Sequence, residues 1–151
     1  MGTKIFVNLP VKSLSRAMEF FSGLGFTFNS QFTDETAACM MIGEDISVML
    51  LTEAKFKAFT PKAICDAKKN TEVLVCLSAD SRTKVDEMVR KAVASGGATY
   101  SEPQDYGFMY AHGFQDLDGH IWEIMCMEPG AKKQEKDRRA PQERAPHRQR
   151  G

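Results

Sequence analysis

One carboxylate stands in an otherwise apolar segment late in the sequence. Glu123 is flanked by Trp122 and Ile124, and Ile121 and Met125 extend the apolar stretch on both sides. A carboxylate that faces a largely apolar cavity has a raised pKa, because burial disfavours its charged form. Such a group serves as a general base or binds a cationic or hydroxylic ligand. The alternative is an acid that pairs with a nearby donor and has only a structural role.

Two further polar residues lie on the preceding predicted strand. Tyr110 and His112 share one face of that strand, because side chains alternate with a period of two. If that face points inward, Tyr110, His112 and Glu123 converge, and a histidine beside a carboxylate is oriented and made more basic. This hypothesis makes Glu123 and His112 the candidate catalytic residues. His120 follows Gly119 in a turn and is expected to be exposed with a structural role.

A short segment before that strand carries two aromatic residues. Asp105, Tyr106, Gly107 and Phe108 are typical of a loop at the mouth of a cavity. Tyr106 and Phe108 are then placed to stack on a flat ligand. Packing in the core is the alternative.

The elements that must position these residues occur twice along the chain. Residues 4–52 and residues 72–128 each begin with a strand, continue with a helix that glycines end, and finish with further strands. In the second copy, these further strands are expected around residues 98–101, 107–115 and 121–127. Overlaying the copies pairs Phe6 with Leu74 and Met49 with Glu123. A βαβββ order repeated twice predicts an α+β fold, in which a curved sheet carries the helices on its outer face.

The composition is that of an ordinary globular chain, with 42% hydrophobic and 26% charged residues in 151. Residues 1–130 are predicted to form one domain, and no apolar run approaches the roughly 18 residues that a membrane helix needs. No signal-peptide-like stretch opens the chain, so we expect a cytoplasmic protein without membrane contact. The four cysteines have no CxxC spacing and lie in or beside apolar stretches. Buried thiols in a reducing compartment are the favoured interpretation, with a disulfide or reactive thiolate as the alternative.

The end of the chain has a different character. Residues 131–151 carry eight Lys and Arg against three acidic residues, a net charge of +5, whereas residues 1–130 carry a net charge of −5. This tail has no aliphatic residue larger than alanine, so it is predicted to be disordered. An acidic body without a basic face argues against dedicated nucleic-acid binding. The alternative is a weak arm for nucleic acid or for another acidic partner.

Two motifs resemble the vicinal-oxygen-chelate superfamily of glyoxalase I, bleomycin-resistance proteins and extradiol dioxygenases. The first is Leu9–Ala17 followed by Phe20, Phe21 and residues 24–26; the second is Phe114–Ile124, with its Asp-x-Asp-Gly-x-x-x-Glu pattern. The resemblance covers about residues 4–128. It implies paired βαβββ modules that form an incomplete mixed-sheet barrel around a cavity, with the helices outside. In metal-using members this cavity holds a divalent Lewis acid on four ligands.

Carried onto this sequence, the four implied ligand positions fall on Phe6, Met49, Leu74 and Glu123. Only Glu123 has a competent side chain, because a thioether is a poor ligand for a hard cation and Phe and Leu are not ligands. One carboxylate does not hold Zn²⁺ tightly. We therefore assign no metal ligands and no cofactor, with a weakly bound divalent metal as the alternative.

The leading hypothesis is a small-molecule-binding glyoxalase/bleomycin-resistance-like protein with a degenerate metal site. The resemblance also implies a homodimer, because family members pair so that modules of two chains complete each cavity. The alternative function is a divalent-metal-dependent lyase, isomerase or dioxygenase that acts on vicinal oxygens. A third hypothesis is a scaffold whose basic tail binds an acidic partner. Under the leading hypothesis, the ligand pocket is lined by Phe6, Met49, Leu74, Tyr106, Phe108 and Tyr110.

Overall fold

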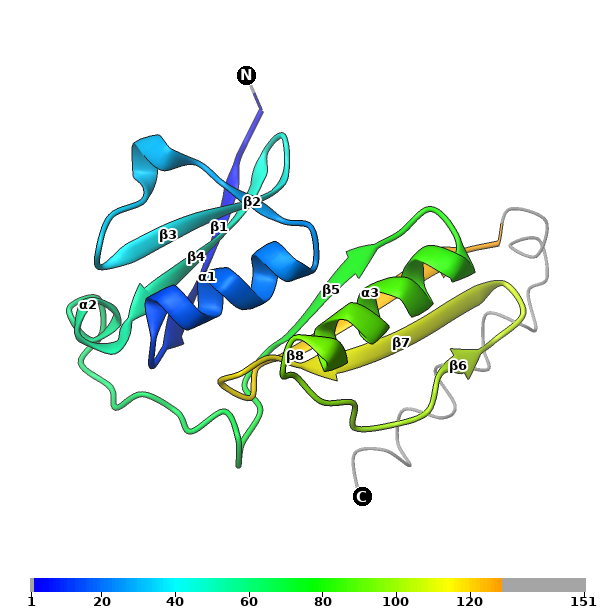
Figure 1. The fold of residues 1–151 in the computed structure, drawn as a ribbon. Coiled ribbons are helices and arrows are strands. Elements are labelled where there is room, and N and C mark those ends of the chain that lie inside the picture. Colours follow the sequence, from blue (N-terminus) through cyan, green and yellow to red (C-terminus); the bar gives the residue numbers. More distant parts are fainter. Residues whose placement is uncertain (1, 129–151) are drawn as a thin grey trace.

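Two copies of one strand–helix–sheet unit follow each other along the chain (Figure 1). The computed structural model describes residues 2–128, so the tail predicted at residues 131–151 lies outside the described residues. We refer to residues 5–52 as the first module and to residues 74–127 as the second module.

The first module is a four-stranded mixed sheet with one long helix. Its elements are β1 (Ile5–Val11), α1 (Leu14–Gly23), β2 (Thr27–Phe28), the 3-10 turn η1 (Ser30–Phe32), β3 (Ala37–Gly43) and β4 (Ile46–Thr52). The strand order is β1-β4-β3-β2, with β1 parallel to β4 and the other pairs antiparallel. Ser13 caps α1, because its Oγ accepts a hydrogen bond from the N–H of Arg16 at 3.3 Å. A short helix, α2 (Glu53–Lys57), then begins the connection to the second module.

The second module repeats this topology. Its elements are β5 (Leu74–Ser78), α3 (Arg82–Ala94), β6 (Gln104–Asp105), β7 (Met109–Gln115) and β8 (Ile121–Met127), in the strand order β5-β8-β7-β6. The strand predicted at residues 98–101 is wrong. Ala98 makes only an isolated bridge to Gln115, and regular pairing with β7 resumes at Gln104. Pro103, which has no N–H to donate, interrupts the ladder between them.

One apolar core joins the two modules. Phe20 and Phe21 on α1 are 2% and 1% exposed, and they contact Phe114 and Trp122 on the second sheet, both fully buried. The ring centroids of Phe21 and Trp122 are 5.0 Å apart, and those of Phe20 and Phe114 are 6.1 Å apart. The helix of the first module therefore packs directly on strands of the second.

Each sheet has a helix face and a face that no helix of its module covers, which we call the open face. In β8, Trp122 and Ile124 are buried on the helix face, so Glu123 between them points to the open face. In β1, Leu9 and Val11 are buried, so Phe6 and Asn8 point to the open face. The helices cover one side of both sheets (Figure 1).

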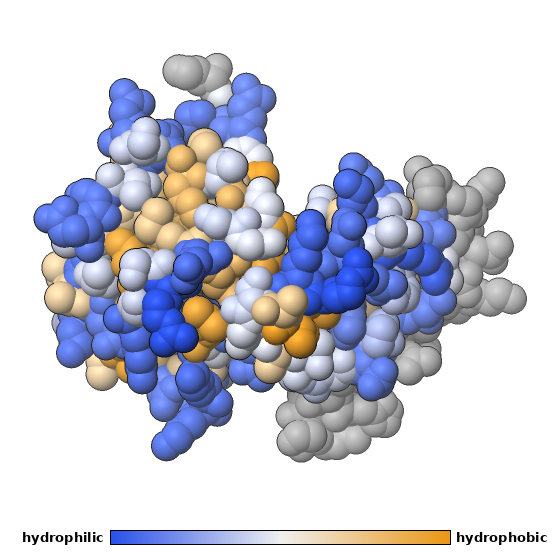
Figure 2. All heavy atoms as spheres, viewed as in Figure 1, coloured by the Kyte–Doolittle hydropathy of each residue, from blue (hydrophilic) through white to orange (hydrophobic). Residues whose placement is uncertain are grey.

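The α+β class, the paired modules and the helices on one side of the sheets are confirmed. The sheets themselves are two separate four-stranded mixed sheets that are not closed into a barrel. None of the helices within residues 2–128 combines the length and apolarity needed to cross a bilayer. Figure 2 shows the helix-bearing side, where hydrophilic side chains gather over the second module and apolar ones over the first module and the junction.

Candidate functional site

A row of three residues crosses the open face of the second sheet at Glu123. The strand register pairs Glu123 with Cys76 on β5 and with Gly113 on β7. Residues paired across neighbouring strands point to the same face. Glu123 is half-buried and Cys76 is exposed, so the row is accessible from the open face.

Tyr100 covers the glycine end of this row. A Cβ built on Gly113 would overlap the Tyr100 hydroxyl and lie 2.9 Å from the Trp122 carbonyl oxygen. Only glycine leaves room for the aromatic ring to approach the strand so closely. The Tyr100 phenol therefore lies against Gly113, the residue that pairs with Glu123. Sequence reasoning missed Tyr100, although a glycine inside a strand is the signal of such a close approach.

The surroundings of Glu123 on its strand and on β5 are apolar. Ile121 and Met125 flank it at two residues' distance on the same face, and Leu74 pairs with Ile121. Burial, with a smaller contribution from the Glu123 charge, raises the pKa of the Cys76 thiol. Cys76 is therefore a neutral neighbour of the carboxylate at physiological pH rather than a thiolate.

The first sheet presents an equivalent but uncharged row. Met49 on β4 pairs with Asn8 on β1 and with Cys39 on β3. Phe6 lies two residues before Asn8, just as Leu74 lies two residues before Cys76. The predicted overlay of Phe6 on Leu74 and of Met49 on Glu123 is therefore confirmed by the strand register. Asn8 and Cys76, which point to the open face beside these positions, were not anticipated.

The predicted convergence of Tyr110, His112 and Glu123 is wrong. His112 pairs with the buried Ile124, so it lies on the helix face, opposite Glu123. Its Nε2 lies 3.1 Å from the carbonyl oxygen of Ser101. Tyr110 lies on the same helix face, where it contacts α3 rather than a ligand pocket. The alternation correctly placed Tyr110 and His112 together, but on the wrong side of the sheet.

Tyr106 and Phe108 also lie away from Glu123. They occupy the turn between β6 and β7, where their ring centroids are 6.4 Å apart and Phe108 is buried. Phe108 is five residues from Gly113 along the chain, which is roughly 17 Å of extended strand. The structure therefore does not bring these two aromatic residues to the row that contains Glu123.

The turn before β8 has a structural role. Buried Asp116 accepts hydrogen bonds from Trp122 Nε1 at 3.0 Å and from the N–H groups of Asp118 and His120 at 2.9 and 3.0 Å. Burial raises the pKa of Asp116, and the His120 charge and these hydrogen bonds oppose that shift. Asp118 accepts from the N–H of Lys12, and His120 Nε2 lies 2.7 Å from the Pro10 carbonyl oxygen. The turn thus fastens the second module to the end of β1.

The expectation of four buried cysteines holds for two of them. Cys39 and Cys126 are buried, whereas Cys65 and Cys76 are exposed, and all four are free thiols. Cys65 lies in the connection after α2, and Cys76 lies on the open face. An apolar stretch in the sequence does not show whether its strand is covered on both faces.

The family follows from a match to nearly all of this fold. A family model for the Glyoxalase/Bleomycin resistance protein/Dioxygenase superfamily matches residues 5–124, from the start of β1 into β8. The chain belongs to this superfamily. No curated protein matches the chain by sequence.

Several solved structures share this fold. The hypothetical protein SA1046 from S. aureus is 27% identical, with a TM-score of 0.72 over 83% of this chain and 95% of that chain. A superfamily enzyme from Burkholderia phytofirmans PsJN is 14% identical, with a TM-score of 0.70 over 84% of this chain and all of that chain. Lactoylglutathione lyase from Agrobacterium tumefaciens is 15% identical, with a TM-score of 0.62 over 83% and 94%. At 14% and 15% identity, the last two show the fold alone.

The residues present do not fit the divalent metal that the superfamily resemblance implies. The four implied positions carry a phenyl ring, a thioether, an isobutyl group and one carboxylate. Within residues 2–128, no group of three or more His, Cys, Asp or Glu side chains is arranged to hold a metal ion. Divalent catalytic sites in proteins use three or more nitrogen, oxygen or thiolate ligands.

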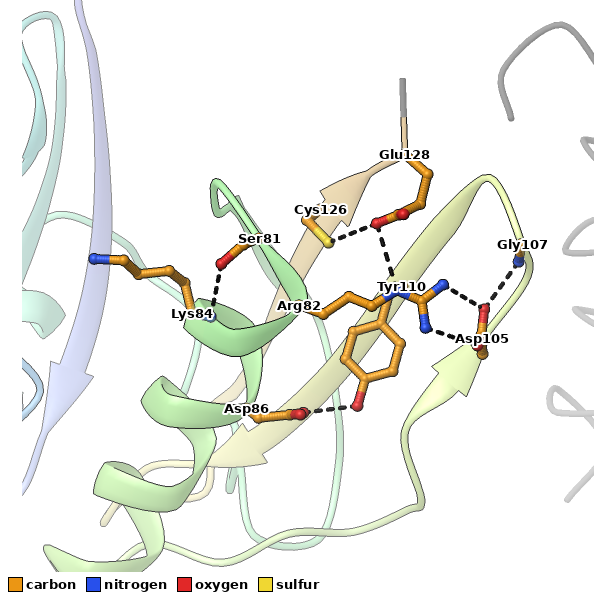
Figure 3. A network of polar contacts seen from close by, with 9 residues as sticks. All are labelled: Ser81, Arg82, Lys84, Asp86, Asp105, Gly107, Tyr110, Cys126 and Glu128. Carbon is orange, nitrogen blue, oxygen red and sulfur yellow. Dashed lines mark hydrogen bonds and ion pairs between the residues drawn. The ribbon is translucent and has the colours of Figure 1, made fainter. Parts of the chain in front are cut away.

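Tyr110 belongs to a polar network on the helix face (Figure 3). Arg82 at the start of α3 donates to both carboxylate oxygens of Asp105 at 2.8 and 2.9 Å, and through Nε to Glu128 at 3.4 Å. Its guanidinium lies 4.9 Å from the centre of the Tyr110 ring, and the Tyr110 hydroxyl donates to Asp86 at 2.7 Å. The bond to Asp86, together with burial, raises the pKa of Tyr110 to about 12. The network ties β6 and the end of β8 to α3.

Replacing Arg82 by methionine is expected to change how stability depends on pH. The hydrogen bonds from Arg82 lower the pKa of Asp105 from its ordinary value of 3.8. A lowered folded-state pKa contributes stability that is present above the unfolded value and is lost as the pH falls through the folded value. Urea unfolding should therefore show that wild type is more stable than Arg82→Met above pH 3.8. The difference in unfolding free energy between the two proteins should shrink as the pH falls below this value. Arg90→Met, at an exposed position on the same helix, is the control. A difference in unfolding free energy between wild type and Arg82→Met that does not change with pH would contradict the network's role.

Proposed function

We propose that this protein binds a small organic molecule on the open face of its second sheet, without a resident metal. The observation that carries the proposal is the row of Cys76, Glu123 and Gly113. It places one half-buried carboxylate among apolar neighbours, at one of the four metal-ligand positions that the superfamily resemblance implies. A carboxylate in such surroundings selects a hydroxyl, amide or cationic group on an otherwise apolar molecule.

The neighbouring side chains suit an adaptable pocket. Met125 lies two residues from Glu123 on the same face, and in the first sheet Met49 occupies the position equivalent to Glu123. Thioethers fill irregular space and adjust to ligands of different shapes. The Tyr100 phenol lies at the Gly113 end of the row and provides a second polar group for orientation.

A second copy of the chain completes the site in this proposal. Phe6 and Leu74 are 53% and 52% exposed on the open faces of the first strands of the two modules. Met41 and Met127 extend these apolar faces. Exposed apolar side chains on the face of a sheet favour association, because burying apolar surface releases about 25 cal/mol per Å². We therefore propose a homodimer in which the open faces of two chains meet.

Sedimentation analysis tests the dimer. The full chain is expected to sediment as a dimer at micromolar concentration, and Phe6→Glu/Leu74→Glu as a folded monomer, because each glutamate would place a charge in the interface. Phe59→Glu is the matched control, because Phe59 is 68% exposed but lies in the connection outside both sheets. A monomeric wild type, or a dimeric double variant, would contradict the arrangement.

The cytoplasm is the proposed location. Two exposed free thiols, Cys65 and Cys76, support it, because exposed thiols persist in reducing compartments. A metal-dependent lyase, isomerase or dioxygenase remains the alternative function, but the residues at the implied ligand positions give it little support.

A thermal-shift screen tests the binding function. The full chain, treated with a chelator, is screened against small organic acids, phenols, amines and amides. At least one class is expected to raise the melting temperature of wild type and of Glu87→Gln, a control on α3, but not of Glu123→Gln. The proposal fails if the only stabilising compounds require added metal or act equally on Glu123→Gln.

A further inference from the structure

A pocket of about 360 Å³ lies at the junction of the two modules, and none of Cys76, Glu123 and Gly113 lines it. Asn8, Leu9 and Pro10 of β1 form one wall, and the start of β8 with residues 72–73 forms another. The connection between the modules, residues 60–71, and Phe56 of α2 close it. Its volume lies within the range of about 300–1,000 Å³ that is typical of ligand sites.

The walls of this pocket are fixed to each other. His120 Nε2 lies 2.7 Å from the Pro10 carbonyl oxygen, which joins the start of β8 to the end of β1. Asp118 accepts a hydrogen bond from the N–H of Lys12 at 2.9 Å just beyond. A pocket held by such contacts is already formed before a ligand enters, so binding does not require a large loss of entropy.

The lining combines apolar walls with unpaired polar groups. Leu9, Phe56, Val73 and Ile121 provide apolar surface. Among residues 2–128, no hydrogen-bond or ion-pair partner is present for the side chains of the lining residues Asn8, Lys62 and Asn70. They are two carboxamides and one cation, which together can bind an anionic group and a carbonyl.

The charge of the connection favours an anion. Residues 53–72 carry five lysines against three acids, a net charge of +2, within a body whose net charge is −5. A cationic site in an acidic surface attracts anions locally, and the attraction is strongest where apolar walls reduce screening. Glu72 also lines the pocket, so one acid opposes Lys62 there.

We propose that this junction pocket binds a small apolar organic anion, such as an aromatic carboxylate, with Lys62 as its charge partner. The apolar body packs between Phe56 and Ile121, and the carboxamides of Asn8 and Asn70 donate to its polar end. The pocket borders the open face through Asn8 and Ile121, but none of Phe6, Met49, Leu74, Cys76 and Glu123 lines it.

Two exposed cysteines make the site directly testable. Cys65 lines the junction pocket, whereas Cys76 pairs with Glu123 on the open face. The probe is 1-anilinonaphthalene-8-sulfonate, an apolar anion, and its uncharged counterpart is N-phenyl-1-naphthylamine. Iodoacetamide labelling of the reduced full chain is followed by peptide mass spectrometry with and without the anion. The anion is expected to slow labelling of Cys65 and to leave that of Cys76 unchanged, in wild type and in Glu123→Gln.

Matched charge variants test the role of Lys62. Lys62→Glu is expected to weaken binding of the anionic probe about tenfold, the effect of reversing one partly screened charge contact, and to leave the neutral probe almost unaffected. Lys57→Glu is the control, because Lys57 lies on α2 outside this pocket. Ala63→Phe, at an exposed lining position, is expected to block both probes. Protection of Cys76 instead of Cys65, equal weakening of both probes by Lys62→Glu, or no binding of the anion would overturn the proposal.

Discussion

An Asp116→Ala variant is expected to lose about 3–5 kcal/mol of unfolding free energy, because each buried donor left without a partner costs about 1–3 kcal/mol. The Asp116 carboxylate is 6% exposed and accepts three hydrogen bonds, one from Trp122 Nε1 and two from backbone N–H groups of the turn. Alanine removes both carboxylate oxygens and with them all three hydrogen bonds. Chemical denaturation followed by circular dichroism measures the loss.

The neighbouring acid provides the control for this prediction. Asp118 accepts one hydrogen bond, from the N–H of Lys12, at a more accessible position. Asp118→Ala is therefore expected to cost only about 1 kcal/mol, the usual value of one hydrogen bond. Equal effects of the two substitutions would show that the buried carboxylate does not organise the turn.

A Phe21→Ala variant is expected to destabilise both modules together by about 3–5 kcal/mol, the usual effect of truncating a buried phenylalanine. Phe21 belongs to the first module, but its ring lies 5.0 Å from that of Trp122 in the second. Because the core is shared, the loss of this contact should lower the stability of one cooperative unit. The fluorescence of Trp122, the single tryptophan of the chain, and far-UV circular dichroism should therefore report the same unfolding midpoint.

A phenylalanine outside the core serves as the control here. Phe32 in η1 is 63% exposed, so Phe32→Ala should change stability by no more than about 0.5 kcal/mol. Two separate transitions in Phe21→Ala, with the second module as stable as in wild type, would indicate that the modules fold independently.

The periodicity of the sequence predicted most of the fold. Apolar alternation, glycines after each helix and the turn at Gly119 predicted both modules, because these signals are local. The repeat then placed Phe6 opposite Leu74 and Met49 opposite Glu123, and the strand register agrees. Because the two modules repeat the same elements, each strand has an equivalent strand that indicates its register.

The sequence pattern does not show which face of each strand the helix covers. Period-two alternation groups Tyr110 with His112, but it does not tell which side of the sheet the helix covers. That depends on contacts distant in sequence, such as the bond from Tyr110 to Asp86. The junction pocket was missed for a related reason, since its walls come from residues 8–10, 60–73 and 119–121. No local pattern indicates that these segments meet.

The metal content of the purified full chain tests the central claim most directly. The protein is prepared without chelator, incubated with Ni²⁺, Zn²⁺ or Fe²⁺ and desalted, and its metal is then measured together with that of Glu123→Gln. Because Phe6, Met49 and Leu74 provide no suitable ligand, we predict far less than one equivalent per chain in both proteins. One tightly bound equivalent in wild type that disappears in Glu123→Gln would contradict a metal-free binding site.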